Sequence, residues 1–394
     1  MTSLRILHIV PSVARVYGGP SEAAVNLCAA LAAQGMQVTL LTTNANGDRG
    51  QPPLPAPLNQ AIAQDGYEIR YFRCQPFRRY KFSPGLLHWL WHHASEFDVA
   101  HIHALFSPVS TAAAMIARSR GVPYLLRPLG TLDPADLQKK RWLKDLYGRV
   151  LERGNLAAAA AIHFTSDREA QVSERFGAIT RDLVLPLGVT SAPFPSTPDL
   201  SLIPTRPSGT PIVLFLARID RKKGLELLIP ALEQLQAQDV PFHWVVAGAN
   251  PQDSAYEQQM RDRIQQSPLQ TQTTLLGFVT GDRKAQLLQQ ADVFVLPSHY
   301  ENFGLAVAEA MLSHTPVVIS DQVSIANAVQ QAEAGWVVPC TVKALVEALA
   351  HALHHPAERE RRGRNAHALA QTAYNWSAIA QQLIQVYRQI VHEG

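Results

Sequence analysis

The chain has 394 residues, of which 47% are hydrophobic and 17% are charged, and its formal net charge is +3. This length exceeds what one hydrophobic core usually serves, so we expect two domains, and the composition excludes a disordered chain. The small net charge does not favour nucleic acid as a partner. The three cysteines lie far apart, which indicates reduced thiols rather than a disulfide framework or a zinc site.

The beginning of the chain predicts a cytoplasmic protein. An apolar strand over residues 6–10 follows Met1 closely, which does not fit the pattern of a signal peptide. No apolar run reaches the ~18 residues of a membrane span. Any membrane contact is therefore expected to be peripheral, on the inner face of the cytoplasmic membrane.

Two stretches of the chain share one plan. A strand over residues 5–10 leads through a glycine-rich loop to a helix over residues 23–34 and a further strand. A strand over residues 212–217 likewise leads through a basic loop to a helix over residues 225–236 and a further strand. Each stretch is a βαβ unit that opens a doubly wound sheet, so the sequence predicts two similar α/β domains.

The boundary between the domains is marked by proline. Five prolines between residues 193 and 207 exclude regular secondary structure there. We therefore predict an N-terminal Rossmann-like domain over residues 1–192, a linker over 193–209 and a C-terminal Rossmann-like domain over 210–375. The last segment, residues 376–394, is predicted to be an amphipathic helix that crosses back to the N-terminal domain.

The glycine-rich loop of the first domain contains Gly18 and Gly19. Adjacent glycines let a backbone approach an anion closely, although they also occur in simple tight turns. The loop has neither the Walker A pattern nor the G-x-G-x-x-G fingerprint, and the next strand ends in Thr42-Thr43 rather than in an acid. NAD binding is therefore disfavoured.

His101 and His103 lie on the strand predicted over residues 99–104. Alternation places both on one face, with His103 nearer the carboxyl end, where ligands of α/β sheets bind. His103 is therefore either a core histidine or a ligand contact. No third ligand is spaced for a metal site, so none is predicted.

The segment from Leu137 to Arg153 is amphipathic and strongly basic. Its apolar residues form one helical face, while cations occupy much of the rest. The apolar face consists of Leu143, Leu146, Tyr147, Val150 and Leu151, and the cations are Lys139, Lys140, Arg141, Lys144, Arg149 and Arg153. Such a helix either packs on the core with a solvated basic face or contacts a membrane surface.

The basic loop of the second domain runs from Arg218 to Gly224. It follows the first strand and opens a helix, so it places cations and backbone N–H groups at the carboxyl edge of the sheet. This arrangement suits a diphosphate, although a basic loop that is simply solvated would show the same sequence pattern.

Two carboxylates bracket the helix predicted over residues 303–313. Glu309 is the only charged residue between Leu305 and Leu312, and no Lys or Arg lies at helical spacing from it. A carboxylate in apolar surroundings needs a partner, and we expect that partner to be a ligand. Glu301 lies on the preceding turn, where it is either a solvated residue or a second ligand contact.

Together these motifs resemble glycosyltransferase family 4, a retaining family with the GT-B fold of two doubly wound Rossmann-like domains facing across a cleft. The resemblance covers nearly the whole chain, and residues 127–134 with the basic helix after them resemble bacterial enzymes of exopolysaccharide assembly. The motifs that carry it are the Gly18-Gly19 loop, residues 98–103, Arg218 with Lys223-Gly224, residues 276–279, the Glu301-to-Glu309 motif and Asn375-Trp376.

The resemblance implies a role for each matching residue. Arg218 and Lys223 would bind the donor diphosphate, Glu309 the ribose, and Glu301 with neighbouring amides the transferred sugar. His103 would contact the sugar near the reacting carbon, and the implied catalytic residues are His103, Arg218, Lys223 and Glu301. The implied donor-binding residues are Gly18, Gly19, Arg218, Lys223, Gly277, Phe278, Val279, Glu301, Asn302, Phe303, Gly304, Leu305 and Glu309.

The resemblance predicts a retaining, metal-independent hexosyltransferase of polysaccharide biosynthesis. Its donor would be a nucleotide diphosphate sugar, for which family frequency favours UDP-glucose, and its acceptor a saccharide or lipid-linked saccharide. No cofactor beyond the donor is implied. A GT-B-like sugar-nucleotide epimerase and a non-catalytic sugar-nucleotide-binding subunit are the alternatives.

Overall fold

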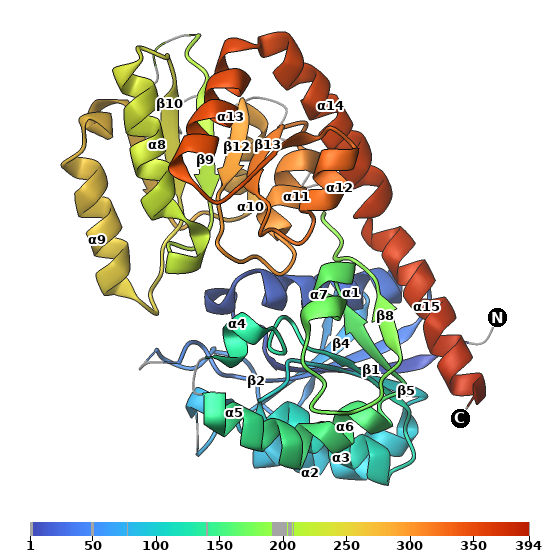
Figure 1. The fold of residues 1–394 in the computed structure, drawn as a ribbon. Coiled ribbons are helices and arrows are strands. Elements are labelled where there is room, and N and C mark those ends of the chain that lie inside the picture. Colours follow the sequence, from blue (N-terminus) through green and yellow to red (C-terminus); the bar gives the residue numbers. More distant parts are fainter. Residues whose placement is uncertain are drawn as a thin grey trace. The chain divides into compact units, whose positions relative to one another are not determined.

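The computed structural model describes residues 3–48, 51–76, 78–138, 141–190, 203, 207 and 209–393. The chain divides into two compact units, one formed by Met1–Gly188 with Trp376–Gly394 and the other by Val189–Asn375 (Figure 1). The first unit therefore ends at Gly188 rather than at residue 192, and it includes the C-terminal helix. The predicted linker over residues 193–209 lies almost entirely outside the described residues.

The first unit contains an eight-stranded sheet with the order β3-β4-β2-β1-β5-β6-β7-β8. All neighbouring strands are parallel except the pair β3 and β4 at one edge. The strands are β1 (Arg5–Ser12), β2 (Gln37–Thr43), β3 (Ala61–Gln64), β4 (Tyr67–Phe72), β5 (Val99–His103), β6 (Tyr124–Arg127), β7 (Ala161–Phe164) and β8 (Asp182–Val184).

Helices cover both faces of this sheet (Figure 1). An apolar core joins one face to α2, α3 and α6. On the other face α1 packs against α15, and α15 contacts β5. The helices are α1 (Gly19–Ala33), α2 (Pro84–His93), α3 (Pro108–Ser119), α4 (Pro134–Leu137), α5 (Arg141–Tyr147), α6 (Arg153–Ala158), α7 (Asp167–Val172) and α15 (Trp376–Glu393).

The second unit contains a fully parallel sheet with the order β11-β10-β9-β12-β13-β14. The strands are β9 (Ile212–Leu216), β10 (His243–Ala247), β11 (Thr273–Gly277), β12 (Val293–Leu296), β13 (Val317–Ser320) and β14 (Gly335–Val338). The strand order reverses between β9 and β12. In a doubly wound sheet, ligands bind beyond the carboxyl ends of the strands at this point.

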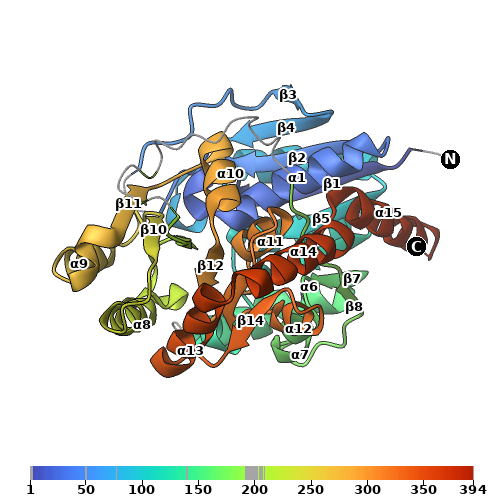
Figure 2. The ribbon, with the colours of Figure 1, turned by 90° about the horizontal axis from the view of Figure 1, so that it is seen from above.

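In the second unit, helices connect the successive strands, α13 and α14 follow the last strand, and α14 runs beside α11 (Figure 2). They are α8 (Leu225–Ala237), α9 (Ser254–Gln265), α10 (Gly281–Gln290), α11 (Leu305–Leu312), α12 (Ala326–Gln331), α13 (Val342–His354) and α14 (Pro356–Ala373). The prediction of two doubly wound α/β domains is confirmed. None of the described helices combines the length and hydropathy that crossing a bilayer requires.

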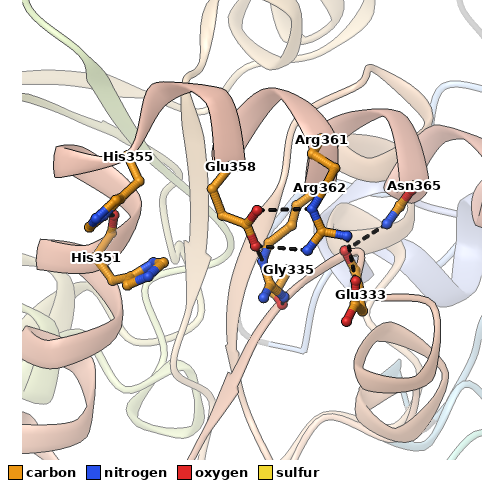
Figure 3. Close-up of polar contacts among 8 residues, drawn as sticks. All are labelled: Glu333, Gly335, His351, His355, Glu358, Arg361, Arg362 and Asn365. Atoms are coloured by element: carbon orange, nitrogen blue, oxygen red, sulfur yellow. Dashed lines mark hydrogen bonds and ion pairs between the residues drawn. The ribbon is translucent and has the colours of Figure 1, made fainter.

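An ionic network fixes α14 to the edge of the second sheet (Figure 3). Glu358 accepts hydrogen bonds from Arg361 at 2.8 Å and from Arg362 at 2.7 Å. Arg361 also pairs with Glu333, and Arg362 donates to the carbonyl oxygen of Gly335 in β14. These arginines hold the pKa of Glu358 down at about 2, so the carboxylate stays charged far into the acid range.

Candidate active site

The basic loop of the second unit lies at the carboxyl end of β9. Residues Arg221–Lys223 form a short 3₁₀ turn, and the carboxylate of Asp220 caps it by accepting from the Lys222 amide at 3.0 Å. Gly224 follows with φ of +71°, and a Cβ atom there would lie 2.0 Å from the carbonyl oxygen of Pro297. Glycine is therefore required where this loop passes the loop that follows β12.

The loop after β12 is joined to the basic loop by backbone and side-chain contacts. The amide of His299 donates to the carbonyl of Lys222 at 2.8 Å. Further along the loop, the carboxylate of Glu301 forms an ion pair with the ammonium of Lys223, and both side chains are only 17% exposed. The structure thus brings together two predicted site residues that are 78 positions apart in sequence.

Gly304 ends this loop and begins α11. Its φ is +91°, so it adopts a left-handed conformation that other residues rarely tolerate. The predicted helix over residues 303–313 accordingly starts at Leu305. The side chain of Phe303 is buried against Tyr374, with 5.3 Å between the ring centroids, so only its backbone is available to a ligand.

Glu309 has a partner within the protein. Its carboxylate accepts a hydrogen bond from the ammonium of Lys284 in α10 at 2.7 Å, and the two side chains are 17% and 21% exposed. We expected the partner of this charge to be a ligand, and the structure shows that the protein itself supplies one. Lys284 belongs to another helix and has no periodic relation to α11, so spacing along α11 could not reveal it.

Other predicted donor contacts of the second unit lie on loops after β9 and β11. The Arg218 side chain is 40% exposed, and its Nε atom lies 3.9 Å from a carboxylate oxygen of Asp220. Gly277 ends β11 and leads to Phe278, whose side chain is 62% exposed, and to Val279, which is buried. Phe278 therefore presents an aromatic ring beyond the carboxyl end of its strand.

In the first unit, Gly18 and Gly19 lie between β1 and α1. Gly18 has a φ of +75° and caps α1, and Gly19 is the first helical residue. No heavy atom lies within 4 Å of a Cβ built on Gly18, so its glycine identity meets a conformational need rather than a packing need.

His103 lies at the end of β5, as predicted, but its side chain has no exposed surface. Its Nε2 atom lies 3.0 Å from Nδ1 of His8 in β1, and its ring stacks on that of His101 at 4.7 Å. Nδ1 of His103 has no hydrogen-bond partner in the described part of the chain. A ligand could reach this atom only if the side chain became accessible.

His8 was not singled out from the sequence, because a histidine within a buried strand has no local signature. The ring nitrogens of His8, His101 and His103 lie within 4.8 Å of one another, which is close enough for a metal ion. Burial is the main cause that lowers the pKa of each of these histidines, and the positive charge of the neighbouring buried Arg127 lowers it further. The same field opposes a metal cation, and no carboxylate belongs to the group.

The comparisons with known proteins identify the family. A model described as "Glycosyl transferase 4-like domain" matches residues 18–188, and one described as "Glycosyl transferases group 1" matches residues 199–369. The chain belongs to glycosyltransferase family 4. The resemblance seen in the motifs is confirmed, and the structural neighbours confirm the GT-B type of fold.

Individual members of the family match the chain to different extents. It is 28% identical to the phosphatidyl-myo-inositol mannosyltransferase of Mycobacterium leprae, over 99% of this chain and 98% of that protein. It is 30% identical to the alpha-D-kanosaminyltransferase of Streptomyces kanamyceticus, but over only 46% of each chain. The structure of Anabaena Alr3699/HepE in complex with UDP-glucose matches with a TM-score of 0.75 at 17% identity, over 98% and 100% of the two chains.

The buried histidines of this family 4 chain predict a specific pH dependence of stability. Burial lowers the pKa of His8 and of His163 to about 3, whereas histidines of the unfolded chain titrate near 6.5. Between these values the unfolded state binds more protons, so the free energy of unfolding falls as the pH falls below 6.5. Each such histidine should contribute up to about 1.4 kcal/mol per pH unit.

Urea unfolding at pH 7.5, 6.0 and 5.0 would measure this slope. His163→Gln should reduce it, whereas His354→Gln, which changes a histidine of α13 for which no such burial is seen, should leave it unchanged. Equal slopes for the wild type and His163→Gln would contradict the assignment.

Proposed function

We propose that the chain is a retaining hexosyltransferase that moves a sugar from a nucleotide diphosphate, best UDP-glucose, to a saccharide or lipid-linked saccharide in polysaccharide biosynthesis. The observation that carries this proposal is the meeting of Lys223 and Glu301 where the strand order of the second sheet reverses. A cation for phosphate and a carboxylate for sugar hydroxyls then lie side by side at the place where α/β sheets bind ligands.

The ion pair also suggests how the site is prepared for the donor. With both side chains largely buried, each charge compensates the other, and neither is left unpaired before the donor binds. A diphosphate that binds here would replace Glu301 as the ionic partner of the Lys223 ammonium. The carboxylate of Glu301 would then be available to accept hydrogen bonds from hydroxyl groups of the sugar.

In the proposed reaction, the bond between the anomeric carbon and the β-phosphate oxygen breaks while the acceptor hydroxyl attacks from the same face. The departing phosphate takes the acceptor proton. Arg218 and Lys223 would stabilise the charge that grows on this phosphate, which is commonly the largest single contribution to such catalysis. These fixed cations supply the electrostatic stabilisation that a metal ion supplies in other transferases.

Three further observations support details of the donor. The exposed ring of Phe278 at the end of β11 offers a surface for a nucleotide base. The largely buried carboxylate of Glu309 suits ribose hydroxyls, and the HepE structure that shares this fold is a complex with UDP-glucose. Gly18, Gly19 and His103 are proposed to contact the phosphates and the sugar from the first unit.

The first prediction for this function concerns the basic loop. Arg218→Ala and Lys223→Ala should each lower kcat by roughly 10²–10³-fold, the effect of removing one preorganised donor to a developing negative charge. Lys222→Ala is the matched control, because its ammonium lies over the ring of Tyr300 at 5.0 Å. Initial rates with UDP-glucose should also survive EDTA. A rate that falls equally in all three variants, or that depends on added magnesium, would argue against these roles.

A second prediction separates the two possible roles of Glu309. If Glu309 binds ribose, Glu309→Ala should weaken UDP binding by about 1.5–3 kcal/mol in calorimetry, the value of a hydrogen bond to a charged group. Lys284→Ala removes only the protein partner and should change UDP affinity much less. If Glu309 serves only the ion pair, both variants should lower Tm equally and leave UDP affinity unchanged.

The third prediction is stereochemical. Attack from the face of the leaving phosphate retains configuration, so an α-linked donor such as UDP-glucose should give an α-linked product. The anomeric coupling constant in the proton NMR spectrum of the first product measures this directly. A β linkage would exclude the retaining mechanism, and conversion of the donor sugar without any acceptor would identify an epimerase instead.

A peripheral contact with anionic lipid is also proposed, through α5 and the π-helical turn Gly148–Glu152 that follows it. Trp142, Leu143, Leu146 and Val150 are 70%, 43%, 54% and 67% exposed, so successive turns of this segment present apolar side chains to solvent. Tyr147, predicted on that face, instead turns inward to the hydroxyl of Thr111 at 2.7 Å.

The charges around this face suit an anionic surface. Arg141 and Arg153 are exposed, whereas Lys144 is bound to Asp136 at 2.6 Å, and Lys139 and Lys140 lie outside the described residues. A tryptophan among aliphatic side chains, flanked by arginines, is typical of helices that lie in the headgroup region.

Liposome flotation tests this contact. The wild type should float with vesicles containing anionic phosphatidylglycerol and less with neutral vesicles, and Trp142→Ala with Leu146→Ala should abolish flotation. Ile179→Ala is the control, because Ile179 is 93% exposed but lies outside α5. Flotation that ignores lipid charge, or that survives the double substitution, would exclude this surface.

A further inference from the structure

A layer of buried polar side chains lies on the face of the first sheet that α1 and α15 cover. It contains His8 of β1, His101 and His103 of β5, Arg127 of β6 and His163 of β7, all at most 1% exposed. Strand register places them on one face, because His8 pairs with His101 and His103 pairs with Arg127. Of these side chains, the proposed function uses only His103.

Hydrogen bonds link part of this layer to the C-terminal helix. The hydroxyl of Tyr387 in α15 lies 2.7 Å from Nδ1 of His101, and Nε2 of His101 lies 3.3 Å from Nδ1 of His163. Nε2 of His163 lies 3.0 Å from the carbonyl oxygen of Leu185. The chain therefore runs from a side chain of α15 through two strands to a backbone oxygen.

The direction of every hydrogen bond in this chain follows from its end. A carbonyl oxygen only accepts, so Nε2 of His163 must carry the proton and donate to Leu185. Burial keeps the pKa of His163 near 3, so the ring is neutral and its Nδ1 accepts from Nε2–H of His101. Nδ1 of neutral His101 must then accept in turn, and the donor is the hydroxyl of Tyr387.

Two observations agree with that direction. Burial raises the pKa of Tyr387 well above its ordinary value, so the hydroxyl keeps the proton that it donates. Burial also holds the pKa of His101 well below its ordinary value, so this ring is neutral as well. By donating to Nδ1 of His101, Tyr387 stabilises the Nε2–H tautomer from the end of the chain opposite to Leu185.

The ring of His101 in turn stacks against the ring of His103. The two rings stack with centroids 4.7 Å apart and planes 21° from parallel, and His8 holds the edge of His103 through the contact at 3.0 Å. His101 and Tyr387 meet edge to face with centroids 6.0 Å apart. A shift of the His101 ring would therefore move the ring of His103.

We propose that Tyr387 of the C-terminal helix is a positioning residue for His103, acting through the tautomer and ring orientation of His101. The proposal rests on the proposed function, in which His103 contacts the transferred sugar. On this proposal, α15 does more than cover the first sheet, because it also supplies a side chain that orients a residue of the proposed active site. The hydroxyl of Tyr387, and not its ring, is the group that matters.

Tyr387→Phe removes this hydroxyl and keeps the ring. Tyr124→Phe is the matched control, because Tyr124 is buried in the same unit, donates one hydrogen bond to the carbonyl of Asn155 at 2.7 Å and belongs to the apolar core on the opposite face of the sheet. Both variants lose one buried hydrogen bond, so both should lower Tm. Only Tyr387→Phe should alter the histidine layer.

The first measurement needs no substrate. Long-range proton–nitrogen NMR spectra of the full chain labelled with ¹⁵N-histidine, assigned with single His→Gln variants, should show the Nε2–H tautomer at His101 and His163. Tyr387→Phe should shift the His101 and His103 signals, whereas Tyr124→Phe should not. An Nδ1–H tautomer at His101, or His103 signals that ignore Tyr387→Phe, would overturn the proposal.

The second measurement is the rate of transfer from UDP-glucose. Tyr387→Phe should lower kcat by roughly tenfold to a hundredfold, the cost of a small misplacement of a catalytic contact, and leave KM for the donor within about twofold. Kinetics equal to those of Tyr124→Phe would overturn the proposal. If the wild type transfers no sugar from UDP- or GDP-hexoses, the proposed function fails, and the NMR measurement still decides whether Tyr387 orients His101.

Discussion

The ion pair between Lys223 and Glu301 depends on how closely two loops of the second unit approach each other. Gly224 makes that approach possible, because any Cβ at this position would overlap the carbonyl oxygen of Pro297. The loops then share the hydrogen bond from the His299 amide to the Lys222 carbonyl. Because the two backbones are fixed in this way, few rotamers of Lys223 and Glu301 are accessible. Less side-chain conformational entropy is therefore lost when the ion pair forms.

The second carboxylate follows the same physical logic. Glu309 and Lys284 form a pair that is also about four-fifths buried, and its members come from α11 and α10. Removing one partner of such a pair leaves an uncompensated charge, which is more destabilising than the pair itself is stabilising. Both candidate ligand carboxylates are therefore paired with lysines of the same unit, and a bound donor would have to compete with those lysines.

The sequence revealed the features that depend on local pattern and failed for those that depend on tertiary contacts. Apolar runs and turn residues located the first strand of each unit, the strand that carries His101 and His103, and the helix α11, but not β3, β4 or β14. Gly304 with its left-handed backbone shifted the start of α11 to Leu305. The spacing of Glu301, Glu309 and the basic loop identified the family. Lys284 stayed hidden because its contact joins two helices whose relation no periodicity encodes.

The sequence also could not predict how deeply a side chain on a given face of the sheet is buried. Alternation correctly placed His101 and His103 on one face, but it carries no information about what covers that face. The structure covers it with α1 and α15, so His103 is fully buried. Similarly, the amphipathic pattern of α5 located an exposed apolar face, while Gly148 allows the following turn to pack on Phe176 and Tyr147 to turn inward.

The two faces of the first sheet differ in chemistry: one is covered by an apolar core, and the other carries a layer of buried polar side chains. One face joins α2, α3 and α6 in an apolar core that includes Leu7, Ile102 and Phe164, and such burial is the main source of stability. The other face buries four histidines and Arg127, whose Nε and Nη2 atoms have no hydrogen-bond partner among the described residues. Each such unsatisfied atom costs about 1–3 kcal/mol.

A layer that costs stability in this way is not explained by packing, since leucine or valine at the same positions would bury as well without that cost. Sites that break the rules of a well-packed core are commonly functional. The hydrogen bonds from Tyr387 to Leu185 run through the layer in a single direction, so every ring along them is held in one tautomer. A polar layer with defined proton positions can restrict the orientation of the His103 ring more than apolar contacts could. The folding stability that the layer costs is therefore offset by a defined orientation of His103.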